Sequence, residues 1–105
     1  MSTPKTSTPA GDVATKDRAE VRKPRKHKVL LHNDDFTTMQ FVVHVLQKFF
    51  KKSETEAMQI MFTVHHTGMG VAGVYPAEVA EAKVVQVTDY AQANQYPLKV
   101  TSEPE

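Results

Sequence analysis

Apolar residues divide this chain into short segments whose spacing changes between strand-like and helix-like. A β-branched and aliphatic run at residues 29 to 31 stops at an acidic turn, which predicts a buried strand. Apolar positions three and four apart then predict helices over residues 38 to 50 and 54 to 67. Further runs predict a strand at residues 71 to 75, a helix after Pro76 and a short strand at residues 98 to 101.

Capping residues predict where the helices begin and end. Thr37 and Gln40 have the spacing of a capping box, so the hydroxyl group of Thr37 is expected to start the first helix. Ser53 and Glu56 repeat this pattern before the second helix, and Gly68 offers a left-handed residue at its end. The order of elements predicts an α+β fold, a three-stranded antiparallel sheet with three helices on one face (β-α-α-β-α-β).

Length and composition limit the possible classes of protein. A chain of 105 residues and 11.7 kDa has room for one small domain. The absence of cysteine excludes disulfides and thiolate metal sites. No apolar run approaches the ~20 residues that span a bilayer, and the first residues lack the apolar stretch of a secretory signal, so we expect a cytoplasmic protein without membrane contact.

Charge is unevenly distributed along the chain. Residues 1 to 28 hold eight Lys or Arg and three acids, whereas residues 29 to 105 hold five and nine. The first part lacks aromatic residues, so residues 1 to 26 are expected to form a disordered extension before a domain at residues 27 to 101 and a polar tail at residues 102 to 105. The basic run at residues 22 to 28 keeps open an alternative function, a small nucleic-acid-associated or ribosome-related binding domain.

Polar residues of possible chemical importance gather at two places. Asn33, Asp34 and Asp35 follow the first strand, where the same residue types also serve as ordinary turn formers. His65 ends the apolar stripe of the second helix and is expected to face inward or toward a cleft. Histidines and carboxylates leave a metal site open as an alternative, but no known ligand spacing is present. With no ordered serine elbow and no phosphate loop, we expect neither an enzyme nor a cofactor.

Three motifs give the ordered part of the chain a resemblance to a known family. These are Asn-Asp-Asp at residues 33 to 35, Met-x-x-Val-His ending at His65, and Ala-Glu-Val-Ala-Glu-x-Lys ending at Lys83. Together they resemble ClpS, the bacterial adaptors that bring N-end rule substrates to the AAA+ protease ClpAP. The resemblance covers residues 27 to 101, although Phe36, Thr38 and His32 replace the usual Tyr, Pro and aliphatic residue.

The resemblance implies recognition of proteins that begin with Leu, Phe, Tyr or Trp and carry a free α-amino group. It implies that Asn33, Asp34 and His65 hold the ammonium group, with Asp35 supporting the pocket. An amide oxygen, a carboxylate and a neutral imidazole nitrogen are acceptors that suit an ammonium group. The implied apolar lining is Thr37, Met39, Val42, Met61, Val64 and Leu98.

The resemblance also implies a protein partner. Glu78, Lys83 and Phe36 correspond to positions that contact the N-terminal domain of a ClpA-type AAA+ unfoldase, and the N-terminal extension would engage the same machine. Substrates would then be degraded by ClpP. We expect a monomer that binds neither nucleic acid nor metal.

Overall fold

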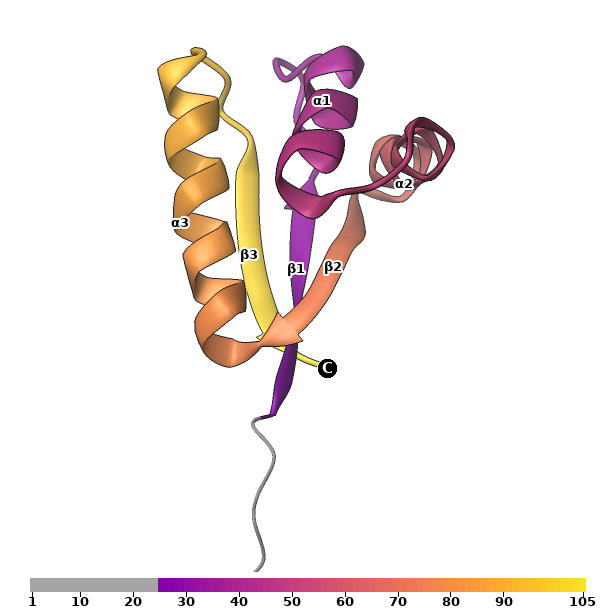
Figure 1. Cartoon of the computed structure of the whole chain (residues 1–105). Coiled ribbons are helices and arrows are strands. Elements are labelled where there is room, and N and C mark those ends of the chain that lie inside the picture. Colours follow the sequence, from indigo (N-terminus) through magenta and orange to yellow (C-terminus); the bar gives the residue numbers. More distant parts are fainter. Residues whose placement is uncertain (1–24) are drawn as a thin grey trace, which may run out of the picture.

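Residues 25 to 105 are described by the computed structural model and form six elements. The residues 1 to 24 of the predicted N-terminal extension lie outside the described residues. The elements, which Figure 1 shows in their order, are β1 (Lys26–His32), α1 (Met39–Phe50), α2 (Glu54–Thr67), β2 (Met69–Pro76), α3 (Ala77–Ala93) and β3 (Lys99–Pro104). The predicted order of strands and helices is confirmed. No helix within residues 25 to 105 combines the length and apolar character that crossing a membrane requires.

The sheet is antiparallel, and its central strand is β1, which pairs with β2 on one side and β3 on the other. Val29 and Leu31 point to the helix-covered face and are fully buried there. Leu30 points to the opposite face, where Val71 and Thr101 flank it from the two edge strands, and it is still buried. A central strand is thus apolar on consecutive positions, which is why it stands out in the sequence.

Strand β2 contains an irregularity that the sequence pattern did not reveal. Val29 pairs with Gly73 but Leu30 pairs with Val71, so Ala72 is an extra residue in β2. This bulge turns Gly70 to the helix-covered face, where a Cβ atom at Gly70 would lie 2.9 Å from the Cγ2 atom of Val64. The missing side chain at Gly70 therefore allows α2 to approach β2 closely.

Strands β1 and β3 are longer than the sequence pattern predicts. β1 begins at Lys26, inside the predicted extension, and β3 continues to Pro104, through most of the predicted polar tail. Lys28 of β1 lies opposite Glu103 of β3, and the Nζ atom of Lys28 is 3.6 Å from a carboxylate oxygen of Glu103. The end of the basic run is therefore part of the sheet.

The start of α1 corrects one capping prediction. Thr38, not Thr37, is the N-cap residue, and its hydroxyl group accepts a hydrogen bond of 3.1 Å from the backbone N–H of Phe41. Thr37 instead donates its hydroxyl hydrogen to Asp34. The Ser53 and Glu56 capping box of α2 and the left-handed Gly68 at its end are both confirmed.

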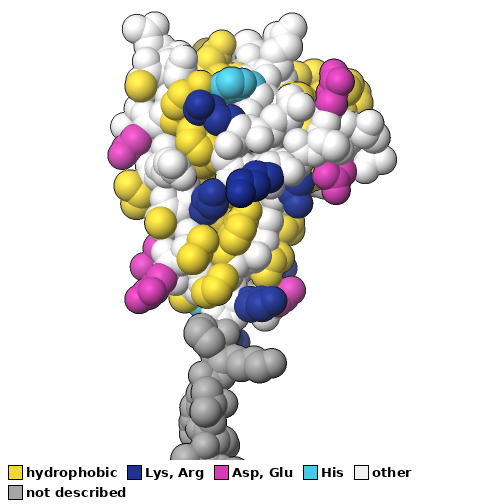
Figure 2. All heavy atoms as spheres, in the orientation of Figure 1, with side chains coloured by type: hydrophobic (Ala, Val, Ile, Leu, Met, Phe, Trp, Pro, Cys, Tyr) yellow, Lys and Arg dark blue, Asp and Glu magenta, His cyan; other side chains and the backbone are white. Residues whose placement is uncertain are grey.

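The C-terminal end of α1 is surrounded by cations. Lys48 lies in the last turn, Lys51 follows it in the left-handed conformation, and the Nζ atom of Lys83 donates a hydrogen bond of 2.7 Å to the carbonyl oxygen of Phe49. Figure 2 shows the basic side chains gathered on this part of the surface. Positive charge at a helix C-terminus is favourable because the free carbonyl groups carry partial negative charge. Lys83 therefore joins α3 to α1.

The observed cap gives a stability prediction. Thr38→Ala removes the acceptor for the Phe41 N–H and should lower the free energy of unfolding by about 1 kcal/mol, measured by urea denaturation. Thr38→Ser keeps the hydroxyl oxygen and should stay close to the wild type. Equal stability of all three proteins would contradict the assignment of the cap.

Candidate functional site

The loop between β1 and α1 is held in shape by the carboxylate of Asp34. One oxygen accepts hydrogen bonds from the backbone N–H groups of Phe36, at 2.8 Å, and Thr37, at 2.7 Å. The other accepts the Thr37 hydroxyl hydrogen at 2.7 Å. Partial burial raises the pKa of Asp34, but these hydrogen bonds outweigh it and the net pKa lies below the usual value. Asp34 is therefore a stable negative charge that also fixes its own loop.

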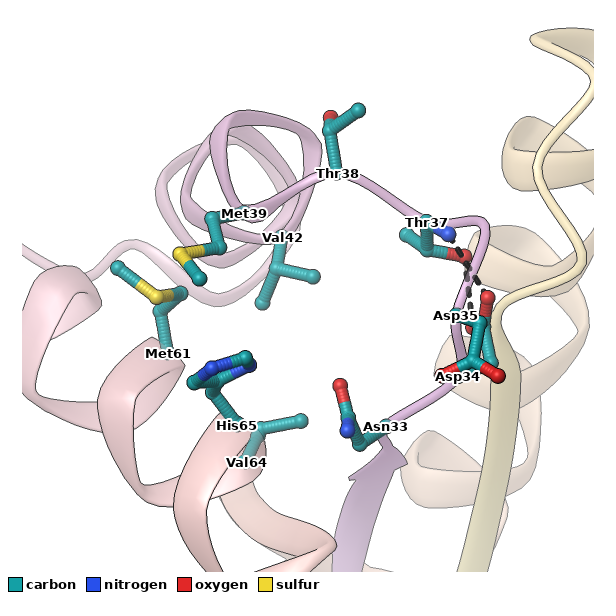
Figure 3. Close-up of a pocket in the computed structure, with 10 residues that line it drawn as sticks. All are labelled: Asn33, Asp34, Asp35, Thr37, Thr38, Met39, Val42, Met61, Val64 and His65. Atoms are coloured by element: carbon teal, nitrogen blue, oxygen red, sulfur yellow. Dashed lines mark hydrogen bonds between the residues drawn. The ribbon is translucent and has the colours of Figure 1, made fainter.

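The same loop is attached to the end of α2. The backbone N–H of Asn33 donates a hydrogen bond of 2.8 Å to the carbonyl oxygen of Gly68, the residue that ends α2. His65 lies one turn earlier, in the last turn of that helix. Figure 3 shows the side chains of Asn33 and His65 facing each other across an open space. Within residues 25 to 105, no other residue hydrogen-bonds to the Asn33 amide group or the His65 ring, so both can accept a guest.

The space between these groups is a cavity of about 320 Å³. Val42, Met61 and Val64 form its apolar side, and each is at most 6% exposed because it also belongs to the core. Met39 stands at the rim with 43% of its surface exposed. The full lining is Asn33, Asp34, Asp35, Thr37, Thr38, Met39, Val42, Met61, Val64 and His65.

Most of the residues singled out from the sequence for this pocket line the cavity, and two differences stand out. Leu98 does not line it. The residue is 4% exposed and packs in the core, after the turn in which Tyr96 contacts Phe41 with ring centres 4.4 Å apart. Thr38 lines the cavity although it was not among the predicted residues. Its position as the first-turn cap of α1 is the signal that could have identified it.

The three predicted partner-contact residues lie outside the cavity and differ in their surroundings. Phe36 is 76% exposed at the tip of the loop, and Glu78 is exposed in the first turn of α3. Lys83 is half-buried, with its ammonium group 5.9 Å from the ring centre of Phe50 and 5.8 Å from that of Tyr75. Lys83 therefore has a structural role of its own.

Two of the histidines considered as metal ligands, His32 and His44, lie away from His65 and contact other side chains. The Nε2 atom of His32 lies 2.8 Å from the hydroxyl oxygen of Thr101 on the open face of the sheet, and that of His44 lies 2.6 Å from the hydroxyl oxygen of Tyr90. In the described part of the chain, no three histidine or acidic side chains come together as metal ligands. The observed geometry thus offers polar acceptors beside an apolar hollow rather than a metal centre.

Such a cavity can hold a small group that is cationic at one end and apolar at the other. The acceptors Asn33 and His65 and the negative charge of Asp34 lie at its polar side. Val42, Met61 and Val64 would bury an apolar group beside them. A single large side chain, together with the adjoining amine, matches this division.

Comparison with known proteins is consistent with this geometry. Residues 22 to 101 match the family model described as "ATP-dependent Clp protease adaptor protein ClpS". A ClpS adapter protein from Desulfatibacillum aliphaticivorans is 58% identical over 95 residues, which cover 90% of this chain and 91% of that protein. One from Deinococcus radiodurans is 56% identical over 95 residues, covering 90% and 84%.

A solved structure is also similar. It is ClpS2 from Agrobacterium tumefaciens bound to L-phenylalaninamide, with a TM-score of 0.76 and 38% sequence identity. The similarity covers 79% of this chain and 100% of that one. The family model, the close relatives and the shared fold lead to one assignment: this chain belongs to the ClpS family of adaptor proteins of the ATP-dependent Clp protease.

Proposed function

We propose that this chain binds the first residue of proteins that begin with Leu, Phe, Tyr or Trp and delivers them to a ClpA-type unfoldase for degradation by ClpP. The observation that carries the proposal is the cavity, which joins uncommitted polar acceptors to an apolar hollow. The ligand of the similar ClpS2 structure, L-phenylalaninamide, has a free α-amino group and one apolar side chain. This ligand chemistry supports the same use of the cavity here.

The α-ammonium group of the substrate sits between Asn33 and His65. It has three N–H donors, and the amide oxygen of Asn33 and a neutral nitrogen of His65 accept two of them. Asp34 supplies the opposite charge from the rim, while its own hydrogen bonds keep the loop in place. An acetylated terminus lacks the positive charge and adds a methyl and carbonyl group where the acceptors lie.

The side chain of the first residue enters the hollow formed by Val42, Met61 and Val64. Burial of a Leu or Phe side chain contributes roughly 1.5 to 3 kcal/mol, and each charge-assisted hydrogen bond contributes a similar amount. Association costs at least ~4 kcal/mol in lost translational and rotational freedom. Even when all three ammonium hydrogen bonds form, these terms sum to at most about −8 kcal/mol, which corresponds to micromolar affinity. The protein acts by binding alone and releases its guest unchanged.

The unfoldase contacts the exposed side chains of Phe36, in the loop after β1, and Glu78, in the first turn of α3. A phenyl ring that is 76% exposed at a loop tip gives a partner a large apolar group to cover. Lys83 lies farther along α3 from Glu78 and is partly engaged with α1, so its contribution to the partner is indirect.

Peptides that differ only at the first residue test the cavity. A peptide that begins with Leu or Phe should bind at least tenfold more tightly than its acetylated form or a peptide that begins with Val. The acetylated peptide loses the ammonium group, and a branch at Cβ would strike Met39 at the rim. Fluorescence anisotropy with labelled peptides measures the difference. Equal affinity for all four peptides would overturn the proposal.

The affinity should depend on pH in a direction set by the charges. It should fall above about pH 8, where the α-amino group of the peptide loses its proton. The pKa of Asp34 is lowered below its usual acidic value by the hydrogen bonds it accepts, so Asp34 stays ionised and causes no loss between pH 5 and 7. A flat profile from pH 5 to 9 would contradict the arrangement.

Phe36→Ala tests the partner surface. The exposed ring makes little contact within the protein, so the change should weaken binding to the isolated N-terminal domain of a ClpA-type unfoldase at least fivefold. Peptide affinity should not change. Val85→Ala removes another exposed apolar side chain, 59% exposed on α3, and serves as the matched control. Equal losses in the two variants, measured by calorimetric titration, would count against a specific role of Phe36.

A further inference from the structure

A second hollow lies beside the cavity. It is a groove of about 310 Å³ between α1 and α2, open to solvent. Met39 and Met61 line both the cavity and the groove, so these two side chains form the ridge between them. Figure 3 shows the two methionines next to each other at the α1 and α2 side of the cavity. The groove is lined by Met39, Gln40, Val43, His44, Gln47, Glu54, Met58 and Met61.

The lining of the groove favours a long side chain with an apolar stem. Met58, 40% exposed, and Val43 add to the two methionines of the ridge and give the groove an apolar floor. Methionine side chains are flexible and adapt to guests of different shape. Gln40 and Gln47 add neutral amide groups to the lining, and among its described residues Glu54 is the one acid. A short side chain would leave this surface in water.

The position of the groove fits the geometry of an extended peptide. Figure 3 shows Met39 across the cavity from Asn33. A chain whose amine is anchored near Asn33 and which extends toward Met39 would therefore pass over the methionine ridge. Successive side chains of an extended chain point to opposite sides, and residues one and three point the same way about 7 Å apart. When the first side chain fills the cavity, the third is directed past the ridge into the groove, and the second points to solvent.

We infer that the groove between α1 and α2 is a subsite for the third residue of the bound substrate, with preference for a long side chain with an apolar stem. This inference rests on the proposed recognition of the first residue. It adds a second point of selection, because proteins with the same first residue would differ in affinity according to their third.

Peptides that all begin with Leu test the subsite. With Ala at position two, Met at position three should bind about fivefold more tightly than Gly at position three. Met at position two with Gly at position three should change the affinity less than twofold. Each peptide is measured with and without an acetyl group, which gives an independent reading of the first-residue site.

A pair of variants on α2 locates the effect. Met58→Ala removes an apolar side chain from the groove and should reduce the gain from Met at position three to less than twofold. Phe62→Ala is the matched control, because Phe62 lies one turn further along α2, is 45% exposed and does not line the groove. The control should keep the full gain, and both variants should keep their sensitivity to acetylation.

The possible outcomes separate the two proposals. If acetylation abolishes binding but Gly and Met at position three bind equally, the subsite is wrong and the first-residue site stands. A gain from position two instead of position three would also overturn the subsite. If acetylation has no effect, the proposed recognition of the first residue fails. A gain that is lost equally in Met58→Ala and Phe62→Ala would place the third residue elsewhere on α2.

Discussion

The site depends on the antiparallel pairing of β1 with β2. The ladder reaches His32 and Met69, and one further hydrogen bond joins the N–H of Asn33 to the carbonyl oxygen of Gly68. The end of a central strand and the end of α2 are thereby held together, although Asn33 and Thr67 are 34 positions apart in the chain. Without this pairing, the acceptor on the loop and the acceptor on the helix would not share one cavity.

The cavity lining and the hydrophobic core share the same apolar residues. Val42, Met61 and Val64 belong to the hydrophobic core and also line the cavity, so the hollow is the open end of the core rather than a separate feature. Taken one at a time, these apolar residues are predicted from the sequence to be core residues. That prediction is correct, but it does not show that they also line a cavity. The cavity exists because the loop after β1 and the end of α2 stand apart above these side chains.

Much of the fold could be predicted from local patterns, since α2 carries its capping box and Gly68 in the sequence itself. The first helix was harder, because Thr37 and Thr38 are both suitable caps and the choice is decided by Asp34, which takes the Thr37 hydroxyl group. Leu98 packs in the core and does not line this cavity, a distinction that spacing cannot make because an apolar residue near a strand can do either. Spacing alone could not bring Asn33 to His65, which required the resemblance.

The hydrogen bonds that Asp34 accepts within its own loop affect the kinetics of substrate binding. Its three hydrogen bonds are made between neighbours in the chain and need no guest to form them. The loop therefore has its shape before a substrate binds, and binding of a substrate N-terminus requires no rearrangement of the loop backbone. Differences in affinity among substrates then arise chiefly from their dissociation rates. The time for which a substrate stays bound must therefore be long enough for its transfer to the protease.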